Sequence, residues 1–432
     1  MGQLENLNKM IALVDVNNFY VSCERLFNPQ LRNKPVVVLS NNDGCIISRS
    51  QEAKELGIKM GQPLFKATTI IKKNHVQVLS SNYAFYADIS NRVMTLLSEF
   101  TDIQEIYSID ECFLNMHGYS NLHSIANEIK QRLWRYLRMP VCVGIGPTKV
   151  LAKLANRSAK KEPHWKGVFI TTSVSEVKMN KIMDSLGADE LWGIGRALSL
   201  KLKLKGVHSI LALKKSSPIF MRKKFSINME KIIYELNGIS CFMIERNNAT
   251  KKEIRSSRSF GRNVTKYTDL EEAITTFVSR AAFKARSQNT VSGKITIFVT
   301  SNPFNKNAKS YGASIDVILE PPTLHTRTIV RGALRGLKEI YKENINYAKC
   351  GVILSNLTEV SKLQDTLVWL KNKETKGLTE VIDKVNNRFN KHSIRPGTQP
   401  LKPAWGMKQS YKSQAYTTSW DSLLKVHCQI NL

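Results

Sequence analysis

The chain has 432 residues and carries 64 Lys and Arg against 35 Asp and Glu, which gives a formal net charge of +29. This length exceeds what one hydrophobic core supports and indicates about three or four domains. The excess of positive charge favours a polyanionic partner, most simply nucleic acid. No stretch approaches about 18 consecutive apolar residues, which argues against a membrane partner. The first residues lack a charged-then-apolar signal, so we expect a cytoplasmic protein.

The seven cysteines are scattered and are never spaced Cys-x-x-Cys, and the eight histidines form no His-x-x-x-His pair. This pattern argues against a structural zinc site and against a disulfide framework.

The first predicted element is a strand over residues 11–16, a continuous apolar run that carries Asp15 near its end. Such a run is typical of a strand buried on both faces. Residues 25–80 form a compact insertion with a second buried strand at 35–39. A short helix near residue 52 follows in this insertion, is closed by Gly57, and carries Lys54 on its polar side.

After a helix predicted between residues 83 and 100, two short apolar runs meet at Asp110 and Glu111. Runs rich in Ile, Tyr and Phe are typical of strands, and the acidic break between them indicates a hairpin with two carboxylates at its tip. A solvated turn would give the same local pattern, and the hairpin by itself does not exclude it.

A helix over 125–137 and a strand over 141–145 follow the hairpin. Without the insertion, the order strand, helix, strand, strand, helix, strand is that of the ferredoxin-like fold, in which the first and third strands lie side by side. Asp15 would then converge with Asp110 and Glu111. Three carboxylates form a hard-oxygen site suited to Mg²⁺, which favours one or two protein carboxylates together with substrate phosphates.

The next predicted helix begins after Thr148 and has an apolar underside. Its opposite face carries Lys149, Lys153, Arg157 and Lys160 at intervals of three or four residues. A basic face of this kind is usually solvated. Because this helix follows directly from the sheet that carries the acids, a phosphate-facing role is the favoured interpretation.

Between two short helices, Gly193, Ile194 and Gly195 form a pattern similar to a helix-hairpin-helix motif. The backbone N–H groups of such a motif can hold a DNA phosphate without reading the base sequence. Lysines at 201, 203 and 205 strengthen this interpretation.

Past a linker, residues 251–262 combine strand-like alternation with dense positive charge. A helix at 270–286, strands at 295–300 and 313–319, a helix at 328–341 and a strand at 351–354 complete a second βαββαβ set without a sequence repeat. The tail beyond could dock in a partner's groove or pack on the chain's own surface, and its composition favours neither.

The chain resembles the Y-family translesion DNA polymerases through four motifs that occur in the family's order. They are Asp15-x-x-x-Phe19-Tyr20, Ser108-Ile109-Asp110-Glu111, the run from Gly144 to Lys153, and Gly193-Ile194-Gly195. More narrowly, the runs 39–45, 80–83 and 192–196 resemble the UmuC branch, which supplies the catalytic subunit of bacterial DNA polymerase V.

The resemblance implies an α+β multidomain fold, a right-hand polymerase with a ferredoxin-like palm, small fingers, a helical thumb, a βαββαβ little finger and a C-terminal tail. The implied domains are a palm at 1–24 and 81–167, fingers at 25–80, a thumb with the helix-hairpin-helix at 168–240, a linker at 241–250, a little finger at 251–355 and a tail at 356–432.

The implied activity is error-prone, template-directed DNA synthesis in the SOS response, by nucleotidyl transfer from a dNTP to a primer 3′-hydroxyl. Asp15, Asp110 and Glu111 would hold two Mg²⁺ ions, helped by the backbone carbonyl of Val16. The logic of two-metal catalysis agrees with this set of ligands.

The resemblance also implies a nucleotide site. Tyr20, preceded by Phe19, matches the steric gate, a ring under the sugar that collides with a 2′-hydroxyl, and a plain core aromatic is the alternative. Lys54 and Lys160 fall where the family contacts the triphosphate. The family usually has Arg at the position of Lys54, and Lys lacks the bidentate fork of Arg, so the grip would be looser or shared with Arg49.

On the first little-finger strand, Arg258, Phe260 and Arg262 would follow the template backbone. Gln364 and Leu367 lie in a stretch where such subunits carry a sliding-clamp peptide, although Asp365 and Val368 depart from the usual Gln-Leu-x-Leu-Phe. The other implied partners are primer-template DNA, a cleaved UmuD-like dimer and a RecA filament, and the implied location is the nucleoid.

Two other classes of protein share some of these features. A DNA-binding subunit without catalysis would be free to lose Asp15, Asp110, Glu111 and Tyr20, so their presence argues against it. A two-metal nuclease would use similar acids but would have no need of a sugar gate.

Overall fold

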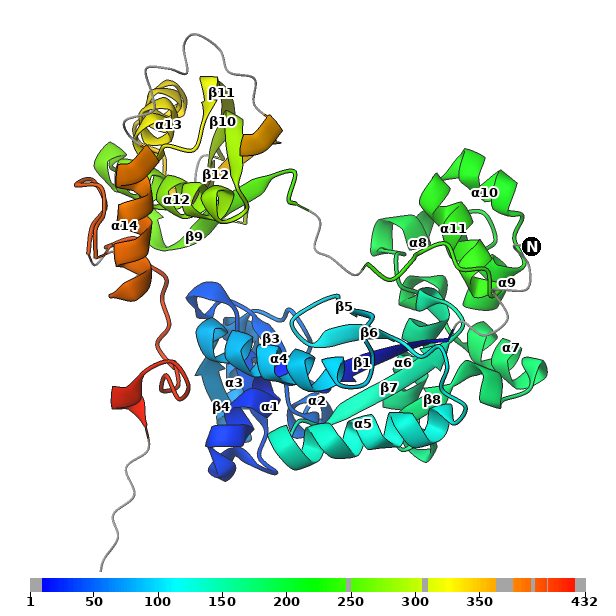
Figure 1. Ribbon diagram of the computed structural model, residues 1–432. Helices are drawn as coiled ribbons and strands as arrows, with labels where there is room; N and C mark the ends of the chain where they lie inside the picture. Colours follow the sequence, from blue (N-terminus) through cyan, green and yellow to red (C-terminus); the bar gives the residue numbers. More distant parts are fainter. Residues whose placement is uncertain are drawn as a thin grey trace, which may run out of the picture. The chain divides into compact units, whose positions relative to one another are not determined.

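The computed structural model, shown in Figure 1, describes residues 10–245, 250–304, 310–362, 376–389, 393–401 and 403–423. The chain forms two compact units. The first consists of Met1–Ser40, Cys45–Asn248 and Tyr411–Leu432, and the second of Asn41–Gly44 and Ala249–Ser410. The end of the chain therefore contributes to both units.

The first unit is built around a five-stranded sheet with the order β5-β6-β1-β7-β8. The elements of this palm region are β1 (Ile11–Val16), α1 (Phe19–Phe27), α4 (Tyr83–Ser98), β5 (Gln104–Ile106), β6 (Glu111–Asn115), α5 (Leu122–Leu137), β7 (Val141–Gly146), α6 (Lys149–Lys161) and β8 (Val168–Ile170). Strand β1 pairs antiparallel with both β6 and β7. The first and third strands thus lie side by side, which confirms the predicted ferredoxin-like palm.

Both faces of β1 are covered, as its apolar sequence predicts. Ala12, Val14 and Val16 pack into a core shared with α1, α4 and α5. Ile11 and Leu13 point to the other face, where they pack with Ala152 of α6. Because side chains alternate along a strand, Asp15 shares the face that is covered by α6.

Strand β8 belongs to the palm sheet, although the thumb was expected to begin at residue 168. It pairs in parallel with β7 and extends the palm sheet, so residues 168–170 are not part of the thumb. Its sequence, Val168-Phe169-Ile170, is buried throughout, which is what an apolar run of three residues achieves by adding to an existing sheet.

The fingers region contains a small sheet with the order β3-β2-β4. Its elements are β2 (Val36–Leu39), β3 (Ile46–Arg49), α2 (Gln51–Glu55), α3 (Leu64–Lys73) and β4 (Gln77–Ser80). The thumb region is helical and consists of α7 (Glu176–Ser185), α8 (Arg196–Lys203), α9 (Ile210–Lys214), α10 (Pro218–Lys224) and α11 (Ile227–Leu236). Its apolar side chains share one core with the underside of α6.

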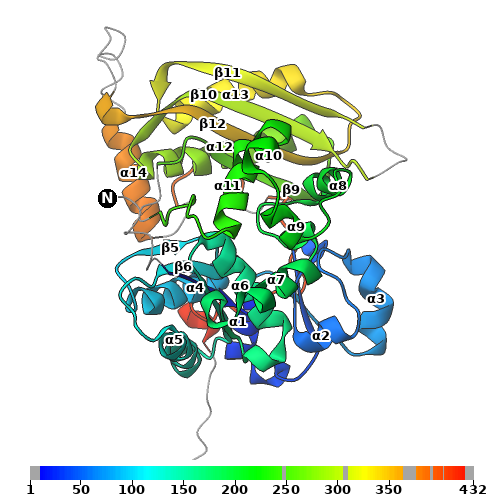
Figure 2. The same cartoon turned by 90° about the vertical axis from the view of Figure 1, so that its right-hand side faces the viewer.

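The second unit holds a four-stranded antiparallel sheet with the order β11-β10-β12-β9. Its elements are β9 (Ile254–Val264), α12 (Tyr267–Ser287), β10 (Thr290–Ser301), β11 (Gly312–Thr323), α13 (Thr326–Ile340) and β12 (Tyr347–Glu359), and α12 and α13 lie on one face of the sheet (Figure 2). The element order repeats that of the palm, but the first strand, β9, lies at an edge. The two βαββαβ sets are therefore different folds.

The described part of the tail packs on the chain itself. In the second unit, Asp383 of α14 (Lys376–Arg388) accepts two hydrogen bonds from Arg286, at 2.6 and 2.9 Å. Trp405 is 4% exposed and packs in the core beside Phe260 and Phe277. The clamp-peptide residues Gln364 and Leu367 lie outside the described residues.

Within the described ranges, we find no helix with the length and apolar character needed to span a bilayer.

Candidate active site

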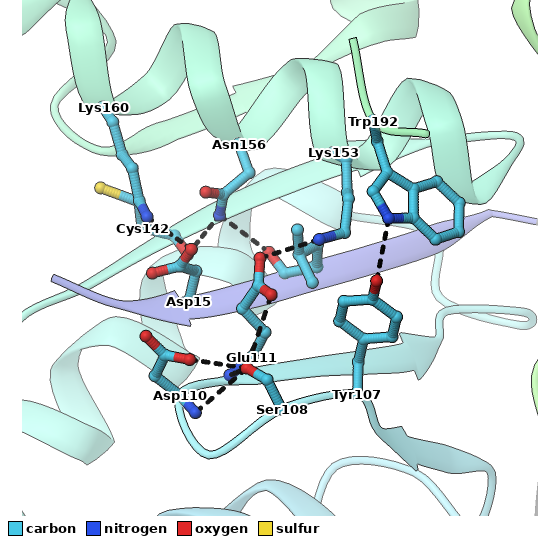
Figure 3. Close-up of polar contacts among 11 residues, drawn as sticks. Asp15, Tyr107, Ser108, Asp110, Glu111, Cys142, Lys153, Asn156, Lys160 and Trp192 are labelled. Carbon is cyan, nitrogen blue, oxygen red and sulfur yellow. Dashed lines mark hydrogen bonds and ion pairs between the residues drawn. The ribbon is translucent and has the colours of Figure 1, made fainter. Parts of the chain in front are cut away.

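The backbone of the palm sheet brings the three acids together (Figure 3). Asp15 of β1 is directly opposite Glu111, the first residue of β6. The backbone N–H of Val16 donates to the carbonyl of Asp110 at 2.9 Å, which ties the hairpin turn to the central strand. Two segments almost a hundred residues apart thus place three carboxylates at one end of the sheet.

Ser108 shapes the turn that carries the acids, and sequence reasoning assigned it no role. Its hydroxyl donates to Asp110 Oδ1 at 2.6 Å and accepts a hydrogen bond from the backbone N–H of Glu111 at 3.1 Å. A Ser two residues before an acid can form such a local turn, which is the signal that was available in the sequence. The turn is therefore a defined structure and not a loosely solvated connection.

Helix α6 packs closely over the central strands because of one residue beneath it, Gly144, and one of its own, Asn156. A Cβ atom at Gly144 of β7 would stand 2.0 Å from the backbone nitrogen of Asn156, so only glycine allows this close approach. The side-chain amide of Asn156 donates to the carbonyls of Leu13 at 3.2 Å and Cys142 at 2.8 Å. These contacts hold α6 against the two central strands.

Two lysines of α6 pair with the acids. Lys160 Nζ lies 2.5 Å from Asp15 Oδ2, and Lys153 Nζ lies 3.0 Å from Glu111 Oε1. Within the described part of the chain, no group of three or more His, Cys, Asp or Glu side chains has metal-binding geometry. The sheet gathers the acids as predicted, but each carboxylate has its own polar partner.

The electrostatics of Asp15 fit a cation site. Burial raises the pKa of its carboxyl from 3.8 to about 6, Lys160 opposes this rise, and the nearby carboxylates of Glu111 and Asp110 add to it. The strand register and the bond between Val16 and Asp110 place these two acids beside Asp15. Oxygen donors that repel one another suit a hard divalent ion, which would relieve the repulsion.

We expect Asp15→Asn to stabilise the metal-free protein more at high pH than at low pH. A carboxyl whose folded pKa is raised contributes stability that is fully present below pH 3.8 and is lost as the pH rises through about 6. Asn carries no such cost, so its advantage should grow by about 2 kcal/mol between about pH 4 and about pH 8. Urea unfolding in the presence of a chelator measures the difference in unfolding free energy between the variant and the wild-type protein at each pH. Asp102→Asn, at an exposed position, is the control. An equal advantage at both pH values would contradict the expectation.

Tyr20 lies beside the acids. Helix α1 starts at Phe19 after Asn18, which has a left-handed backbone conformation with φ 49°. Phe19 is buried in the palm core, whereas Tyr20 is half-buried. Burial, and then the charges of Tyr83 and Asp110, raise the pKa of Tyr20. Tyr20 packs at the edge of the palm core, where its ring stacks on that of Tyr86.

Lys54 of the fingers region lies within electrostatic range of two other cations, Arg49 and Lys160. Burial, Arg49 and Lys160, in that order, lower the pKa of Lys54. The Arg49 guanidinium donates to the carbonyl of Ile58 at 2.5 Å, and its buried Nε has no hydrogen-bond partner in the described structure. Like charges gathered in this way suit a polyanionic ligand such as a triphosphate.

The glycines of the thumb motif occupy the conformations that a tight turn requires. Gly193 has φ +89°, a region that residues with a Cβ rarely adopt, and Gly195 caps the N-terminus of α8. Trp192, just before them, donates from its indole N–H to the Tyr107 hydroxyl at 2.9 Å. This contact joins the thumb motif to the acid-bearing hairpin.

On the little-finger sheet, two of the three expected DNA contacts are on the covered face. Arg258 is opposite Cys350, which is fully buried, and Phe260 packs in the core. Burial, and then the proximity of Arg258, lowers the pKa of Arg280 on α12. Arg258 and Phe260 face the helices, and Arg262, the only exposed residue of the three, lies 3.5 Å from Asp269 at the start of α12.

The uncovered face of this sheet carries a residue that sequence reasoning missed. Arg255 is exposed and lies opposite Ile353 in the register, and its guanidinium is 4.7 Å from the centre of the Phe298 ring. Its neighbour Ile254 is buried. The available signal in the sequence was the even spacing of the apolar residues Ile254, Phe260 and Val264 along β9, which leaves Arg255 on the other face.

Comparisons with known proteins decide the family. The impB/mucB/samB family model matches residues 14–157, and the model of its C-terminal domain matches residues 251–367. Protein UmuC of Salmonella typhimurium is 38% identical over 424 residues, which cover 96% of this chain and 100% of that protein. The chain belongs to the impB/mucB/samB family. A further family model, described only as a domain of unknown function (DUF4113), matches residues 376–426.

More distant relatives of this impB/mucB/samB family member are polymerases. DNA polymerase IV of Picrophilus torridus is 27% identical over 372 residues, which cover 82% of this chain and 99% of that protein. A Y-family DNA polymerase chimera of known structure superimposes with a TM-score of 0.64 at 23% identity and covers 81% of this chain and 99% of its own. The fold is that of a Y-family polymerase, as predicted, and family membership carries a dependence on a divalent metal ion.

Proposed function

We propose that this chain is an error-prone, template-directed DNA polymerase that performs translesion synthesis. It transfers a nucleotidyl group from a dNTP to a primer 3′-hydroxyl. The observation that carries this function is the placement of Asp15 opposite Glu111, with the Asp110 carbonyl bonded to Val16, beside the ring of Tyr20. A nuclease does not need a ring that excludes a sugar 2′-hydroxyl, and a DNA-binding subunit without catalysis does not need three acids that can bind metal ions.

Asp15, Asp110 and Glu111 would hold two Mg²⁺ ions, with the backbone carbonyl of Val16 as a further donor. Bound there, the ions supply a lowered pKa for the primer hydroxyl and charge neutralisation for the departing pyrophosphate. Lys160 and Lys153 neutralise the acids in the absence of the ions. Lys160 is also near Lys54, so its ammonium can turn from Asp15 to a bound triphosphate.

We expect Lys54→Ala to raise the KM for dNTP by about tenfold, because a hydrogen bond to a charged group contributes about 1.5–3 kcal/mol. Steady-state insertion of one nucleotide on a primer-template measures the change. Lys59→Ala is the matched control, since Lys59 is also an exposed lysine of the fingers region but is not among the three clustered cations. An equal KM for the two variants would contradict a triphosphate contact at Lys54.

We expect Arg255→Ala to weaken binding to primer-template DNA of any sequence. Loss of one phosphate contact should lower the slope of log K against log salt by about 0.9. Fluorescence anisotropy over a range of salt concentrations measures this slope. Arg335→Ala is the control, because Arg335 is an exposed arginine on α13, on the opposite face of the same sheet. Equal slopes for the two variants would show that the uncovered face does not bind DNA.

The remaining partners follow from the resemblance to the UmuC branch. We propose that a cleaved UmuD-like dimer and a RecA filament act with this polymerase in the SOS response, in the cytoplasm and at the nucleoid. We also propose that Gln364 and Leu367 contact a sliding clamp. The formal charge of +29 supports association with nucleic acid.

Primer extension separates the three classes of function. The full-length chain is incubated with Mg²⁺, dNTPs and a primer-template that is undamaged or carries an abasic site. A polymerase of this kind extends the primer on both templates, a DNA-binding subunit leaves it unchanged, and a nuclease shortens it. Absence of extension under conditions where the chain binds DNA would remove the proposed function.

A further inference from the structure

A buried carboxylate lies beside Tyr86, the residue on which the ring of Tyr20 stacks. Glu24 of α1 is 1% exposed, and no Lys, Arg or His of the described ranges forms an ion pair with it. Its Oε1 atom accepts one hydrogen bond from the Tyr86 hydroxyl at 2.6 Å and another from the Ser413 hydroxyl at 3.0 Å. A buried acid is costly unless such bonds are made, so both hydroxyls are held in place by it.

Tyr86 connects this carboxylate to the gate. Its ring is fully buried on α4, and the ring of Tyr20 stacks on it with a centroid distance of 4.5 Å and an interplanar angle of 17°. The Tyr86 ring is thus the surface against which Tyr20 rests. If the Tyr86 ring could move, the Tyr20 ring that stacks on it would be able to move as well.

The Ser413 hydroxyl comes from the C-terminal segment, which is built into the first unit. The backbone of Tyr411 exchanges two hydrogen bonds with Ser80, each of 2.9 Å. The side-chain amide of Asn82 donates to Ser413 Oγ and to the carbonyl of Gln414, both at 3.0 Å. These bonds place residues 411–414 beside the end of β4 and the start of α4.

Aromatic packing completes the attachment. The ring of Tyr416 stacks on Phe27 of α1 at a centroid distance of 5.0 Å and an angle of 11°, and it meets the edge of Phe85 at 5.5 Å. Phe85 precedes Tyr86 on α4. The segment therefore contacts both helices that carry the gate, α1 with Tyr20 and α4 with Tyr86.

We propose that residues 411–416 are a specificity-determining segment that positions the steric gate. Ser413 and Tyr416 hold Glu24, Tyr86 and α1 in place, and Tyr20 rests on this assembly. A ring excludes a 2′-hydroxyl only if it cannot retreat by about the size of one oxygen atom, and supporting contacts hold a site to about 0.5 Å. The inference rests on the gating role of Tyr20 in the proposed function. Residues 411–416 lie in the region that matches the domain of unknown function, so the inference assigns a role to part of that domain.

The test measures sugar selection in the full-length protein. The ratio of kcat/KM for a dNTP to that for the matching rNTP is determined for single insertions by Ser413→Ala and Tyr416→Leu. Loss of one hydrogen bond or ring contact should lower this ratio by about threefold to tenfold, with dNTP insertion itself changed by less than about twofold. Ser413→Thr and Tyr416→Phe keep the hydroxyl and the ring and should restore the ratio. Trp420→Ala removes an aromatic that lies shortly after this segment and is 88% exposed, and it should leave the ratio unchanged.

Three outcomes would overturn the proposal. If Ser413→Ala and Tyr416→Leu keep the wild-type ratio while Tyr20→Ala loses it, the gate stands and the segment does not position it. If both variants lose dNTP and rNTP insertion equally, the segment only stabilises the fold. If Tyr20→Ala itself keeps the ratio, the gating role fails and this inference fails with it.

Discussion

Replacement of Asp110 by Ala is expected to lower the rate of nucleotide insertion by about a thousandfold or more, while DNA binding is retained. Asp110 lies in the turn between β5 and β6, and its backbone carbonyl accepts the N–H of Val16, a bond that Ala preserves. The substitution therefore removes one carboxylate from the candidate metal site, together with its hydrogen bond from Ser108, while the backbone bonds of Val16 and Glu111 to the turn remain. Single-turnover primer extension in excess Mg²⁺ measures the loss.

Asp102→Ala is the matched control for this experiment. Asp102 is an exposed acid close to the start of β5, so its removal changes the net charge by the same amount without touching the site. We expect this control to insert nucleotides at the wild-type rate. Near-normal insertion by Asp110→Ala would mean that the acids serve only the structure of the hairpin.

Replacement of Tyr20 by Ala is expected to relax selection against ribonucleotides by about 100-fold, because a cavity that merely has room for an extra hydroxyl rejects it weakly. The half-buried ring lies next to Asp110 and rests on Tyr86. Its removal opens space where a sugar 2′-hydroxyl would otherwise collide. The ratio of kcat/KM for dNTP to that for rNTP measures the effect.

Two further variants make the comparison specific. Tyr20→Phe keeps the ring and should keep most of the discrimination. Tyr136→Ala removes an aromatic of α5 that is 62% exposed, and should not alter the ratio. Equal ratios in Tyr20→Ala and the wild-type protein would mean that Tyr20 only packs in the core and does not select the sugar.

The local pattern of the sequence was sufficient for the elements that carry the acids. The apolar run at 11–16 forms β1 with the bounds that were predicted, and the acidic break in the next apolar pair forms the turn of a hairpin. The order of strands and helices then required β1 to pair with β6. A buried strand needs apolar residues on both faces and a hairpin needs a polar break, so both elements show in the residues themselves.

Other features depended on which elements pack together, and no local pattern contains that information. The lysine spacing of α6 showed a basic face, but only the packing of α6 over β1 pairs Lys160 with Asp15. Alternation along β9 separated two sets of residues, yet the helices α12 and α13 decide which set is covered, so Arg255 is exposed while Arg258 and Phe260 face the core.

The segment at 411–416 shows the same limit most clearly. Its short polar and aromatic sequence predicts no regular element, and its contacts with Glu24 and Phe27 join residues almost four hundred positions apart. The sequence by itself determined the strands, the acids and their order along the chain, because these follow from periodicity over a few neighbouring residues. Only the tertiary structure decided the partners of each side chain, because burial and pairing depend on whichever distant surface covers that face.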